Sequence, residues 1–333
     1  MKKTNWAILG LGKIAKKFAT DLITLPNANL YAVGSRTNKK AKAFAKEFGA
    51  TKSYGSYEAL LADPKVDVVY IATPHVFHCE NTLMALDKGI AVLCEKPLAI
   101  NAKEVALMVA KAKVKNTFLM EALWTLFIPS IKKTKELVAS GVIGEIQSVK
   151  ADFGFKAVFD PKSRLFDPNL GGGSLLDIGI YPLFLAQAFL GKPQSIIASA
   201  VLGATNVDEE LSVTLKYAGG KMAHAHSTIR SHTPIEAYIY GTKGYIHIPT
   251  RFHEPVPHIS LVEYEGLKKT VYRMPQQAIG FKYEAAAVMA YLAVGKKESD
   301  VASLQFSIDL METMDAVRKE IGLVYPMEVT KSK

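Results

Sequence analysis

The sequence predicts an α/β fold in which a doubly wound parallel sheet of the Rossmann type precedes an α+β domain built on antiparallel strands. Three observations predict it. Apolar runs of strand length alternate with helical periodicity over residues 1–122, and a glycine turn joins the first run to the first helix. From residue 195 to about residue 274 the pattern is strand-like, with short glycine-containing turns. We therefore expect one domain over residues 1–122 and a second over residues 123–333.

The composition is ordinary for a globular protein. The 333 residues are 49% hydrophobic and 22% charged, which is enough to bury the cores of two domains. No apolar run approaches the roughly 18 residues that cross a bilayer, and no apolar signal core follows the amino end, so we expect a cytoplasmic protein without a membrane partner. Cys79 and Cys94 are too few for a disulfide framework and lack metal-ligand companions.

The net charge of +10 is concentrated near the amino end, where residues 1–50 hold ten Lys or Arg and two acids. No aromatic residues interleave with these lysines and no recognition-helix motif is present, so we expect no nucleic-acid partner. A site for an anionic small molecule fits this distribution. A lysine-rich solvated helix face explains Lys13, Lys16 and Lys17 equally well.

The first glycine turn has the features of a dinucleotide-binding motif. A short apolar run leads into Gly10-Leu-Gly12-Lys13-Ile14-Ala15, and helical periodicity follows. Gly10 permits a tight turn, Gly12 lets the backbone approach a pyrophosphate, and Ala15 lets helix and strand pack closely. The phosphates would lie on the amides at the start of the helix, beside Lys13 and Ile14.

The second strand, over residues 30–35, ends in Ser35 and Arg36, where an NAD-binding protein would carry an acid for the ribose 2′-hydroxyl. The arginine offers a planar fork of donors to a phosphate, and the serine offers a hydroxyl. Lys40 is a further candidate close by. The sequence therefore predicts NADP as the cofactor, with NAD as the secondary alternative.

The end of the fourth strand is expected to line the same crevice, because ligands bind outside the carboxyl ends of the strands in an open parallel sheet. Thr73-Pro74-His75 follows that strand, and His78 comes one turn later. His75 and His78 have a spacing that a metal site can use. No third ligand is apparent, so we expect a role without a metal.

A buried strand over residues 91–95 ends in the charged tip Glu95-Lys96-Pro97. Lys96 is well placed to meet a substrate at the end of that strand. An isolated lysine there would more often point into solvent, and the surrounding motifs are what favour the functional interpretation. X–Pro bonds tolerate the cis form at modest cost, so we expect a cis bond between Lys96 and Pro97.

The second domain contains two further candidates. Residues 160–168 form an irregular charged stretch around Arg164, which we interpret as a binding loop. Gly171-Gly-Gly173 then opens an apolar helix in which Asp177 and Tyr181 lie four residues apart and therefore on one face. Polar groups on a buried helix face need an explanation. Further helices are predicted over residues 129–140, 280–294 and 303–321.

These motifs together resemble the glucose-fructose oxidoreductase and inositol dehydrogenase family, Gfo/Idh/MocA, over essentially the whole chain. The strings that carry the resemblance are the Gly10 turn, Ser35-Arg36, Ala72-Thr-Pro-His75, Glu95-Lys96-Pro97, Glu121-Ala122, the glycine triplet with Asp177 and Tyr181, Gly241-Thr-Lys-Gly244 and Glu298-Ser299. Met120-Glu-Ala-Leu-Trp124-Thr is most similar to the branch that holds dimeric dihydrodiol dehydrogenase and NADP-dependent D-xylose 1-dehydrogenase. That branch usually has Arg where this chain has Leu126.

The resemblance implies a dinucleotide-binding domain over residues 1–122 and, over residues 123–333, a substrate-binding and dimerisation domain with an open, mostly antiparallel sheet. It implies hydride transfer without a metal, and a homodimer or a dimer of dimers. Lys96 corresponds to the active-site lysine, Asp177 to the substrate-binding acid and Tyr181 to the proton donor or acceptor. The expected cofactor contacts are Gly10, Gly12, Lys13, Ile14, Ser35, Arg36, Lys40, Thr73, Pro74, His75, His78, Glu95, Lys96, Trp124 and Arg164.

We expect an NADP-dependent oxidoreductase that transfers a hydride between the nicotinamide and a CH–OH or C=O group of a sugar, cyclic polyol, dihydrodiol or dicarbonyl compound. Hydride transfer to a carbonyl leaves an alkoxide that needs a proton, and the Tyr181 phenol, whose pKa is ordinarily about 10, supplies it. The Lys96 ammonium within about 4 to 6 Å would lower that pKa, and Asp177 would accept a hydrogen bond from a substrate hydroxyl. The alternative is a non-catalytic NADP(H)-binding sensor or regulator of the same fold, which has no use for a proton-transfer set.

Overall fold

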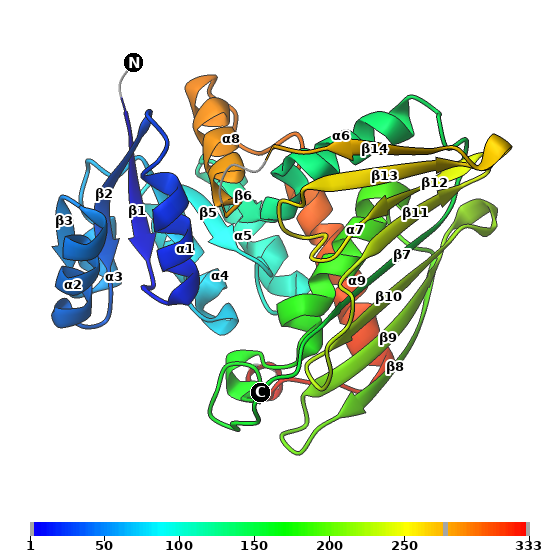
Figure 1. The fold of residues 1–333 in the computed structure, drawn as a ribbon. Coiled ribbons are helices and arrows are strands. Elements are labelled where there is room, and N and C mark those ends of the chain that lie inside the picture. The colour runs from blue at the N-terminus through cyan, green and yellow to red at the C-terminus, as the bar shows by residue number, and fades with distance from the viewer. Residues whose placement is uncertain (1–2, 276–278, 331–333) are drawn as a thin grey trace. The chain divides into compact units, whose positions relative to one another are not determined.

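A computed structural model describes residues 3–275 and 279–330, and in it the chain forms two compact units (Figure 1). The first unit comprises Met1–Phe127 and Gln277–Ile308, and the second comprises Ile128–Gln276 and Asp309–Lys333. Each unit is built on one sheet. The predicted fold class, a Rossmann sheet followed by an α+β domain, is confirmed.

The first unit contains a six-stranded parallel sheet with the order β3-β2-β1-β4-β5-β6, which is the Rossmann order. The direction of growth reverses at β1, and ligands bind at such a switch point. The strands are β1 Thr4–Leu9, β2 Ala28–Gly34, β3 Lys52–Tyr54, β4 Val68–Ile71, β5 Ala91–Glu95 and β6 Leu119–Ala122. The helical segments between them are α1 Lys13–Leu22, α2 Asn38–Phe48, α3 Tyr57–Leu61, η1 His75–Phe77, α4 His78–Asp87 and α5 Ala102–Val114.

The central strands β4 and β5 form because they are largely apolar runs that are buried on both faces. All four residues of β4 and all five of β5 are buried, Glu95 included. Capping residues set the helix boundaries. Asn101 caps α5 by accepting the backbone N–H of Glu104, and α2 ends at Gly49, whose φ of 73° is a conformation that glycine adopts without steric cost.

A late segment of the chain belongs to the first unit. Its helix α8 (Phe281–Ala293) begins beside α1, and Phe281 stacks on Trp124 of η2 (Trp124–Phe127) with ring centroids 4.6 Å apart. The buried Asp21 carboxylate of α1 accepts the backbone N–H groups of Ile279, Gly280 and Lys282 at 3.2, 2.8 and 3.2 Å. The division expected at residue 122 would have placed this segment in the second domain. Its place in the first unit could not be read from the sequence, because hydrogen bonds between residues so far apart in sequence leave no local pattern.

The second unit contains an eight-stranded sheet with the order β14-β13-β12-β11-β7-β10-β9-β8. Neighbouring strands are antiparallel except β7 and β10, which run parallel, so the expected mostly antiparallel sheet is confirmed. The strands are β7 Ile146–Gly154, β8 Ser195–Leu202, β9 Asp208–Lys216, β10 Met222–Thr228, β11 Ala237–Gly241, β12 Gly244–Ile248, β13 His258–Glu263 and β14 Lys269–Arg273.

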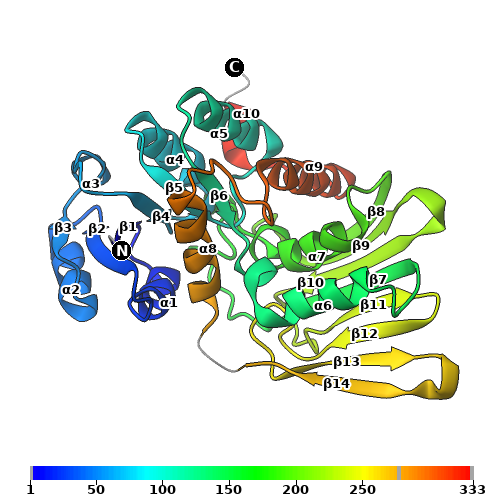
Figure 2. The same cartoon turned by 90° about the horizontal axis from the view of Figure 1, so that it is seen from above.

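Helices cover one face of this second sheet. α6 (Pro129–Ala139) packs on β13, and α7 (Ile180–Leu190) packs on β7 and β10 (Figure 2). The opposite face carries the outward side chains of strands that alternate between buried and half-buried positions, as in β11 and β12. The remaining helical segments are η3 Pro168–Leu170, η4 Leu175–Gly179, η5 Ala218–Gly220, η6 Glu265–Leu267, α9 Leu304–Glu320 and α10 Pro326–Thr330.

The stretch Pro168–Leu190 is long and apolar enough to cross a membrane by length and composition alone. It contains η4, a single π-helical segment, directly before α7. In its most apolar 18-residue window 83% of the residues are buried inside the protein. This stretch therefore belongs to the buried core of the second unit.

Candidate active site

The glycine turn between β1 and α1 fits the diphosphate of a dinucleotide. Gly10 has a φ of +89°, and a Cβ there would lie 2.9 Å from the backbone of Ala72 and from the side chain of Thr73. A Cβ at Gly12, by contrast, would meet no protein atom within 4 Å. No acidic residue lies in the first turn of α1 and no side chain caps it. The turn therefore has open space beside backbone amides that attract an anion.

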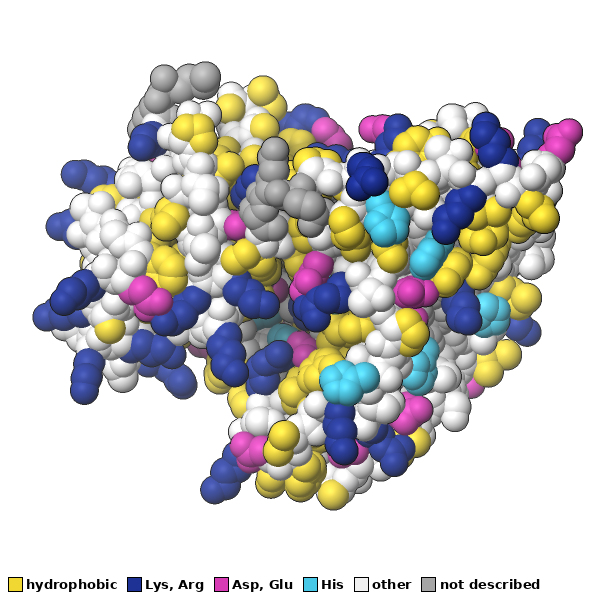
Figure 3. Space-filling model, viewed as in Figure 1, with side chains coloured by type: hydrophobic (Ala, Val, Ile, Leu, Met, Phe, Trp, Pro, Cys, Tyr) yellow, Lys and Arg dark blue, Asp and Glu magenta, His cyan; other side chains and the backbone are white. Residues whose placement is uncertain are grey.

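Basic side chains surround this turn and the end of β2. Ser35 is buried at the strand end, and Arg36 and Lys40 after it are exposed. Lys13, the first residue of α1, is exposed, and Ile14 is half-buried. Figure 3 shows Lys and Arg side chains gathered over the part of the first unit that holds β2, β3 and α2. An exposed guanidinium beside a serine suits a phosphate ester.

His78 links the loops that follow β4 and β5. It is fully buried, and its Nε2 and Nδ1 atoms each lie 2.8 Å from a carbonyl oxygen, of Thr73 and Pro97 respectively. Burial lowers the pKa of His78, and the two carbonyls oppose that effect. The sequence predicted a cofactor contact for His78. A fully buried ring with both nitrogens on backbone carbonyls instead positions the two loops.

The neighbouring residues of this connection lie nearer the surface. Pro74 is exposed, and His75 is 9% exposed, with its ring centroid 5.7 Å from that of His78. Asn81 of α4 donates from Nδ2 to the Thr73 hydroxyl at 3.1 Å. Within residues 3–275 and 279–330 no group of three or more His, Cys, Asp or Glu is placed to hold a metal ion.

Lys96 lies half-buried directly after β5, and its bond to Pro97 is cis, which confirms the prediction. The preceding Glu95 is buried and accepts hydrogen bonds from the Tyr70 hydroxyl and, at 3.2 Å, from the Lys96 backbone N–H. Tyr70 in turn stacks on Phe18 of α1, with ring centroids 3.7 Å apart. The end of β5 is therefore anchored from within the sheet, and Lys96 is the charged group that emerges from it.

Glu121, near the end of β6, holds the segment that follows Pro97. Its Oε1 accepts the backbone N–H of Leu98 at 2.8 Å. Burial raises the pKa of Glu121 to about 7, against the opposing effects of the Ser307 and Leu98 hydrogen bonds and of the Lys96 charge. A carboxyl group with a pKa near neutrality therefore lies within electrostatic reach of Lys96.

The Trp124 region of the first unit is packed against α8. Trp124 is buried and lies nearly parallel to Phe281, at an interplanar angle of 11°, so one face of the indole is covered by protein. Leu126, which replaces the arginine usual in the resembled branch, is only 1% exposed. A site so buried suits leucine, because an unpaired guanidinium there would lose its hydration.

In the second unit Arg164 and Asp177 form an ion pair with two hydrogen bonds. The Nη1–Oδ1 distance is 2.8 Å and the Nη2–Oδ2 distance is 3.2 Å. The Asp177 side chain is 9% exposed and the Arg164 side chain 55% exposed. A bidentate pair of this kind fixes the orientation of the carboxylate. The structure thus places the guanidinium of Arg164, a predicted cofactor contact, on the predicted substrate-binding acid.

Tyr181 lies in the first turn of α7 and is 7% exposed. Its ring packs against Phe153, Phe184 and His253, with centroid distances of 5.4, 5.7 and 4.9 Å. Phe153 and His253 also stack on each other at 4.2 Å. The ring of Tyr181 is therefore held by packing against three other rings.

Sequence reasoning did not select Tyr70 or His253, which support Lys96 and Tyr181 respectively. Tyr70 lies inside an apolar strand, and His253 lies in an irregular segment between β12 and β13. Neither residue belongs to a motif, and their partners lie far away in the sequence. The burial of His253 would have marked it as a candidate, but burial is known only from the folded structure.

The groups in the two units have complementary chemistry. The first unit offers a glycine turn with open space beside backbone amides, a basic strand end and a lysine at the carboxyl edge of a parallel sheet. The second offers the carboxylate of Asp177, which accepts hydrogen bonds from Arg164, and the buried phenol of Tyr181. Together they include each kind of group that hydride transfer between a dinucleotide and an alcohol requires.

Two family matches span much of the chain. The oxidoreductase family with an NAD-binding Rossmann fold, GFO/IDH/MocA, matches residues 4–123, and the GFO/IDH/MocA C-terminal domain matches residues 131–247. Among curated relatives, trans-1,2-dihydrobenzene-1,2-diol dehydrogenase from Xenopus tropicalis is 38% identical over 335 residues, covering 97% of this chain and 99% of the relative. The enzyme of the same name from Mus musculus is 39% identical over 331 residues, covering 97% and 98%.

Solved structures show the same architecture. A 3-ketoreductase from Actinomadura kijaniata, in complex with NADP and TDP-benzene, has a TM-score of 0.85 and 26% identity, covering 96% of this chain and 98% of that one. An aldose-aldose oxidoreductase from Caulobacter crescentus, complexed with glycerol, has a TM-score of 0.86 and 25% identity, covering 96% and 97%.

Proposed function

We propose a specific reaction for this chain, which belongs to the Gfo/Idh/MocA oxidoreductase family. It is an NAD(P)-dependent oxidoreductase that acts on the CH–OH group of a sugar, polyol or dihydrodiol. The finer proposal is that it uses NADP, that Tyr181 exchanges the proton, and that its substrate is a cyclic compound with two neighbouring hydroxyl groups. The observation that carries it is that the second unit holds both a fixed carboxylate, Asp177, and, four residues later, the enclosed phenol of Tyr181.

Two neighbouring hydroxyl groups suit this pair. Asp177 accepts a hydrogen bond from one hydroxyl and fixes which carbon reacts, while Tyr181 takes the proton of the other hydroxyl as its carbon becomes a carbonyl. A bound nicotinamide would supply the acceptor for the hydride of that carbon. In the reverse direction Tyr181 returns the proton to the alkoxide oxygen.

Lys96 serves the proton step. Its ammonium stabilises negative charge on the substrate oxygen, and the anchoring of Glu95 by Tyr70 fixes the strand end from which it emerges. Oxidation needs this help more than reduction does, because an alcohol gives up its proton readily only when the negative charge that develops on its oxygen is stabilised.

The test is Tyr181→Phe, which keeps the ring and removes the hydroxyl that carries the exchangeable proton. Turnover in both directions should fall by at least about a hundredfold, with NADPH affinity nearly unchanged. Tyr217→Phe is the matched control, since Tyr217 also lies in the second unit and is also 7% exposed. Near-normal turnover in folded Tyr181→Phe would refute the assignment, whereas a non-catalytic regulator would bind NADPH and show no turnover even as the wild-type protein.

The NADP preference rests on the exposed Arg36 beside buried Ser35 at the end of β2. Arg36→Ala should weaken the binding of NADPH by about tenfold or more and change that of NADH little, because only NADPH carries the 2′-phosphate. Lys46→Ala, an exposed lysine near the other end of α2, is the control for charge alone. Equal losses for both cofactors in a binding titration would remove Arg36 from the 2′-phosphate site.

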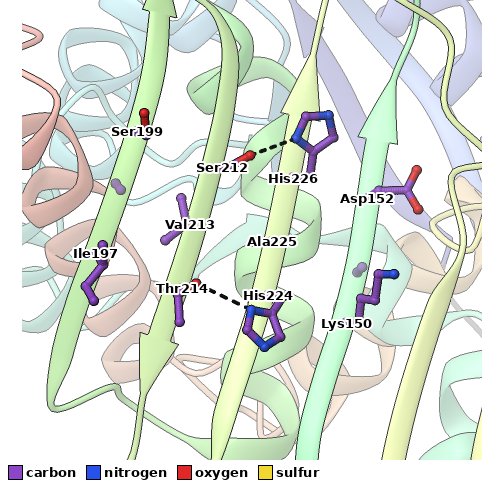
Figure 4. Close-up of a pocket in the computed structure, with 12 residues that line it drawn as sticks. Lys150, Asp152, Ile197, Ser199, Ser212, Val213, Thr214, His224, Ala225 and His226 are labelled. Atoms are coloured by element: carbon purple, nitrogen blue, oxygen red, sulfur yellow. Dashed lines mark hydrogen bonds between the residues drawn. The ribbon is translucent and has the colours of Figure 1, made fainter.

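We further propose a homodimer, or a dimer of dimers, formed through the face of the second sheet that α6 and α7 leave uncovered. That face carries Ile197, Val201 and Val271, which are 54%, 43% and 50% exposed. Part of it is a hollow of about 400 Å³ between β7, β8, β9 and β10, where Ser212 and Thr214 contact His226 and His224 at 3.2 and 3.4 Å (Figure 4). Exposed apolar side chains that share a face with hydrogen-bonding groups are found in subunit interfaces, which combine apolar contacts with direct hydrogen bonds.

Light scattering at micromolar concentration tests this assembly. Ile197→Lys should shift the protein to the monomer, whereas Val114→Lys, at an 81% exposed position of the first unit, should not. A wild-type monomer at that concentration would count against the proposal. The cytoplasmic location stays a prediction from the sequence.

A further inference from the structure

The segment that precedes Asp177 is held by a carboxylate from a distant strand. Asp208, the first residue of β9, is fully buried. Its Oδ2 accepts a hydrogen bond from the Ser174 hydroxyl at 2.8 Å and from the backbone N–H of Leu175 at 2.7 Å. Leu175 is the first residue of the π-helical segment η4, so Asp208 caps this segment from outside.

The network extends to β10 and explains two glycines. The hydroxyls of Ser174 and Ser227 lie 2.9 Å apart. A Cβ at Gly173, where φ is +112°, would lie 2.1 Å from Asp208 Oδ1, and a Cβ at Gly179 would lie 2.8 Å from Ser227 Oγ. Both glycines are therefore required by the side chains that pack against them, one before the π-helical segment and one at its end.

Burying the carboxyl group of Asp208 is energetically unfavourable. Its Oδ1 is buried and has no hydrogen-bond partner among the described residues. Burial raises the pKa of Asp208 to about 7, although the bonds from Ser174 and Leu175 oppose the shift. A carboxyl group kept at this cost, at the positive end of a helical segment, indicates that the position of that segment matters.

We propose that Asp208, with Ser174 and Ser227, is a positioning network that fixes the helical register of Asp177 and Tyr181. An α-helix turns about 100° per residue, so a shift of one residue at Leu175 would move the Asp177 carboxylate to a different face. π-Helical segments carry an extra residue and are energetically marginal, which is why this one needs an external anchor. The inference rests on the proposed roles of Asp177 and Tyr181.

Asp208→Ala removes the anchor, and Asp208→Asn keeps one oxygen that can accept both bonds. In Asp208→Ala we expect turnover per folded molecule to fall by at least about tenfold, because small misplacements of reacting groups are costly, while NADPH affinity stays within about twofold. In Asp208→Asn turnover should recover most of that loss. Ser303→Ala is the matched control, since Ser303 caps α9 by accepting the backbone N–H of Phe306, so it should lower the urea midpoint and leave turnover unchanged.

Hydrogen exchange supplies a readout that does not depend on activity. The amide of Leu175 should exchange at least about tenfold faster in Asp208→Ala than in wild type, because its acceptor is gone. Unchanged exchange at Leu175, or unchanged turnover in folded Asp208→Ala, would overturn the proposal. If Asp208→Ala does not fold, Ser227→Ala removes one bond only, and normal turnover in that variant would overturn it equally.

The exchange result also separates this inference from the proposed function. Normal turnover in Tyr181→Phe would rule out Tyr181 as the proton-transfer group. Faster exchange at Leu175 in Asp208→Ala would still show that Asp208 anchors η4. Wild-type exchange at Leu175 together with a low turnover of Tyr181→Phe would leave the proposed function standing and remove the network.

Discussion

Replacing Gly12 with alanine separates cofactor binding from the stability of the fold. Gly12 has a φ of −87° and a ψ of −166°, which other residues adopt, and a Cβ there meets nothing within 4 Å. Gly12→Ala should leave the free energy of unfolding unchanged or raise it by about 0.4 to 1 kcal/mol, because alanine lowers the entropy of the unfolded chain. The same methyl group fills the space proposed for the pyrophosphate. Cofactor affinity should therefore fall by at least about tenfold, or about 1.4 kcal/mol.

Gly10→Ala should do the reverse and damage the fold first. Its φ of +89° costs an L-residue about 1 to 2 kcal/mol, and a Cβ 2.9 Å from the Ala72 backbone forces a shift that costs about 1 to 3 kcal/mol more. Gly49→Ala isolates the first of these terms, because Gly49 has a φ of +73° and open space around its Cβ position. The order of destabilisation should be Gly10→Ala, then Gly49→Ala, then Gly12→Ala.

Urea unfolding without cofactor measures the three stabilities, and a fluorescence titration with NADPH measures affinity. Wild-type NADPH affinity in folded Gly12→Ala would refute the placement of the pyrophosphate at this turn. A Gly10→Ala variant that is no less stable than Gly49→Ala would show that the contact with Ala72 relaxes freely.

Three further changes test the supports of the site. Glu121 has a folded pKa of about 7, above its ordinary 4.5, so the stability it contributes is complete below about pH 4.5 and is lost as pH rises through 7. Glu121→Gln mimics the neutral acid and should lose less stability than wild type between pH 5 and pH 8, by roughly 1 to 3 kcal/mol in urea unfolding, whereas an identical pH dependence would contradict this. Asp21→Asn places an amide N–H₂ against backbone N–H groups at the start of α8, so it should cost about 1 to 3 kcal/mol and change Trp124 fluorescence as Phe281 loosens; unchanged fluorescence would count against this anchor. His253→Ala removes one of the three rings around Tyr181 and should lower turnover more than cofactor affinity, and equal losses in the two measurements would show that His253 has no specific effect on Tyr181.

Local sequence patterns were sufficient for the first unit's architecture and for the ends of its strands. Continuous apolar runs predict strands buried on both faces, and a glycine turn between strand and helix predicts a phosphate site, because both depend on neighbours in the sequence. The cis bond at Pro97 belongs to the same class, since only an X–Pro bond takes this form readily. Asp177 and Tyr181 could be selected because polar residues on an apolar helix are visible in the sequence itself.

The same reasoning did not predict which protein groups His78 and Arg164 contact. His78 was expected beside the cofactor and is instead buried between two carbonyls, and Arg164 forms an ion pair with Asp177. The sequence shows the length and the hydrogen-bond donors of both side chains. Their partners depend on the conformation of irregular loops, which sequence periodicity does not predict.

The sequence by itself determined the order of the elements, the parallel first sheet and the residue types available for chemistry, because hydrophobic periodicity and turn residues act over a few positions. Only the tertiary structure decided which polar groups meet. Asp21 reaches the start of α8, Glu121 reaches Leu98, and Asp208 reaches Leu175. Each contact joins positions far apart in the chain, and each exists because a buried backbone N–H must find an acceptor wherever folding brings one within reach.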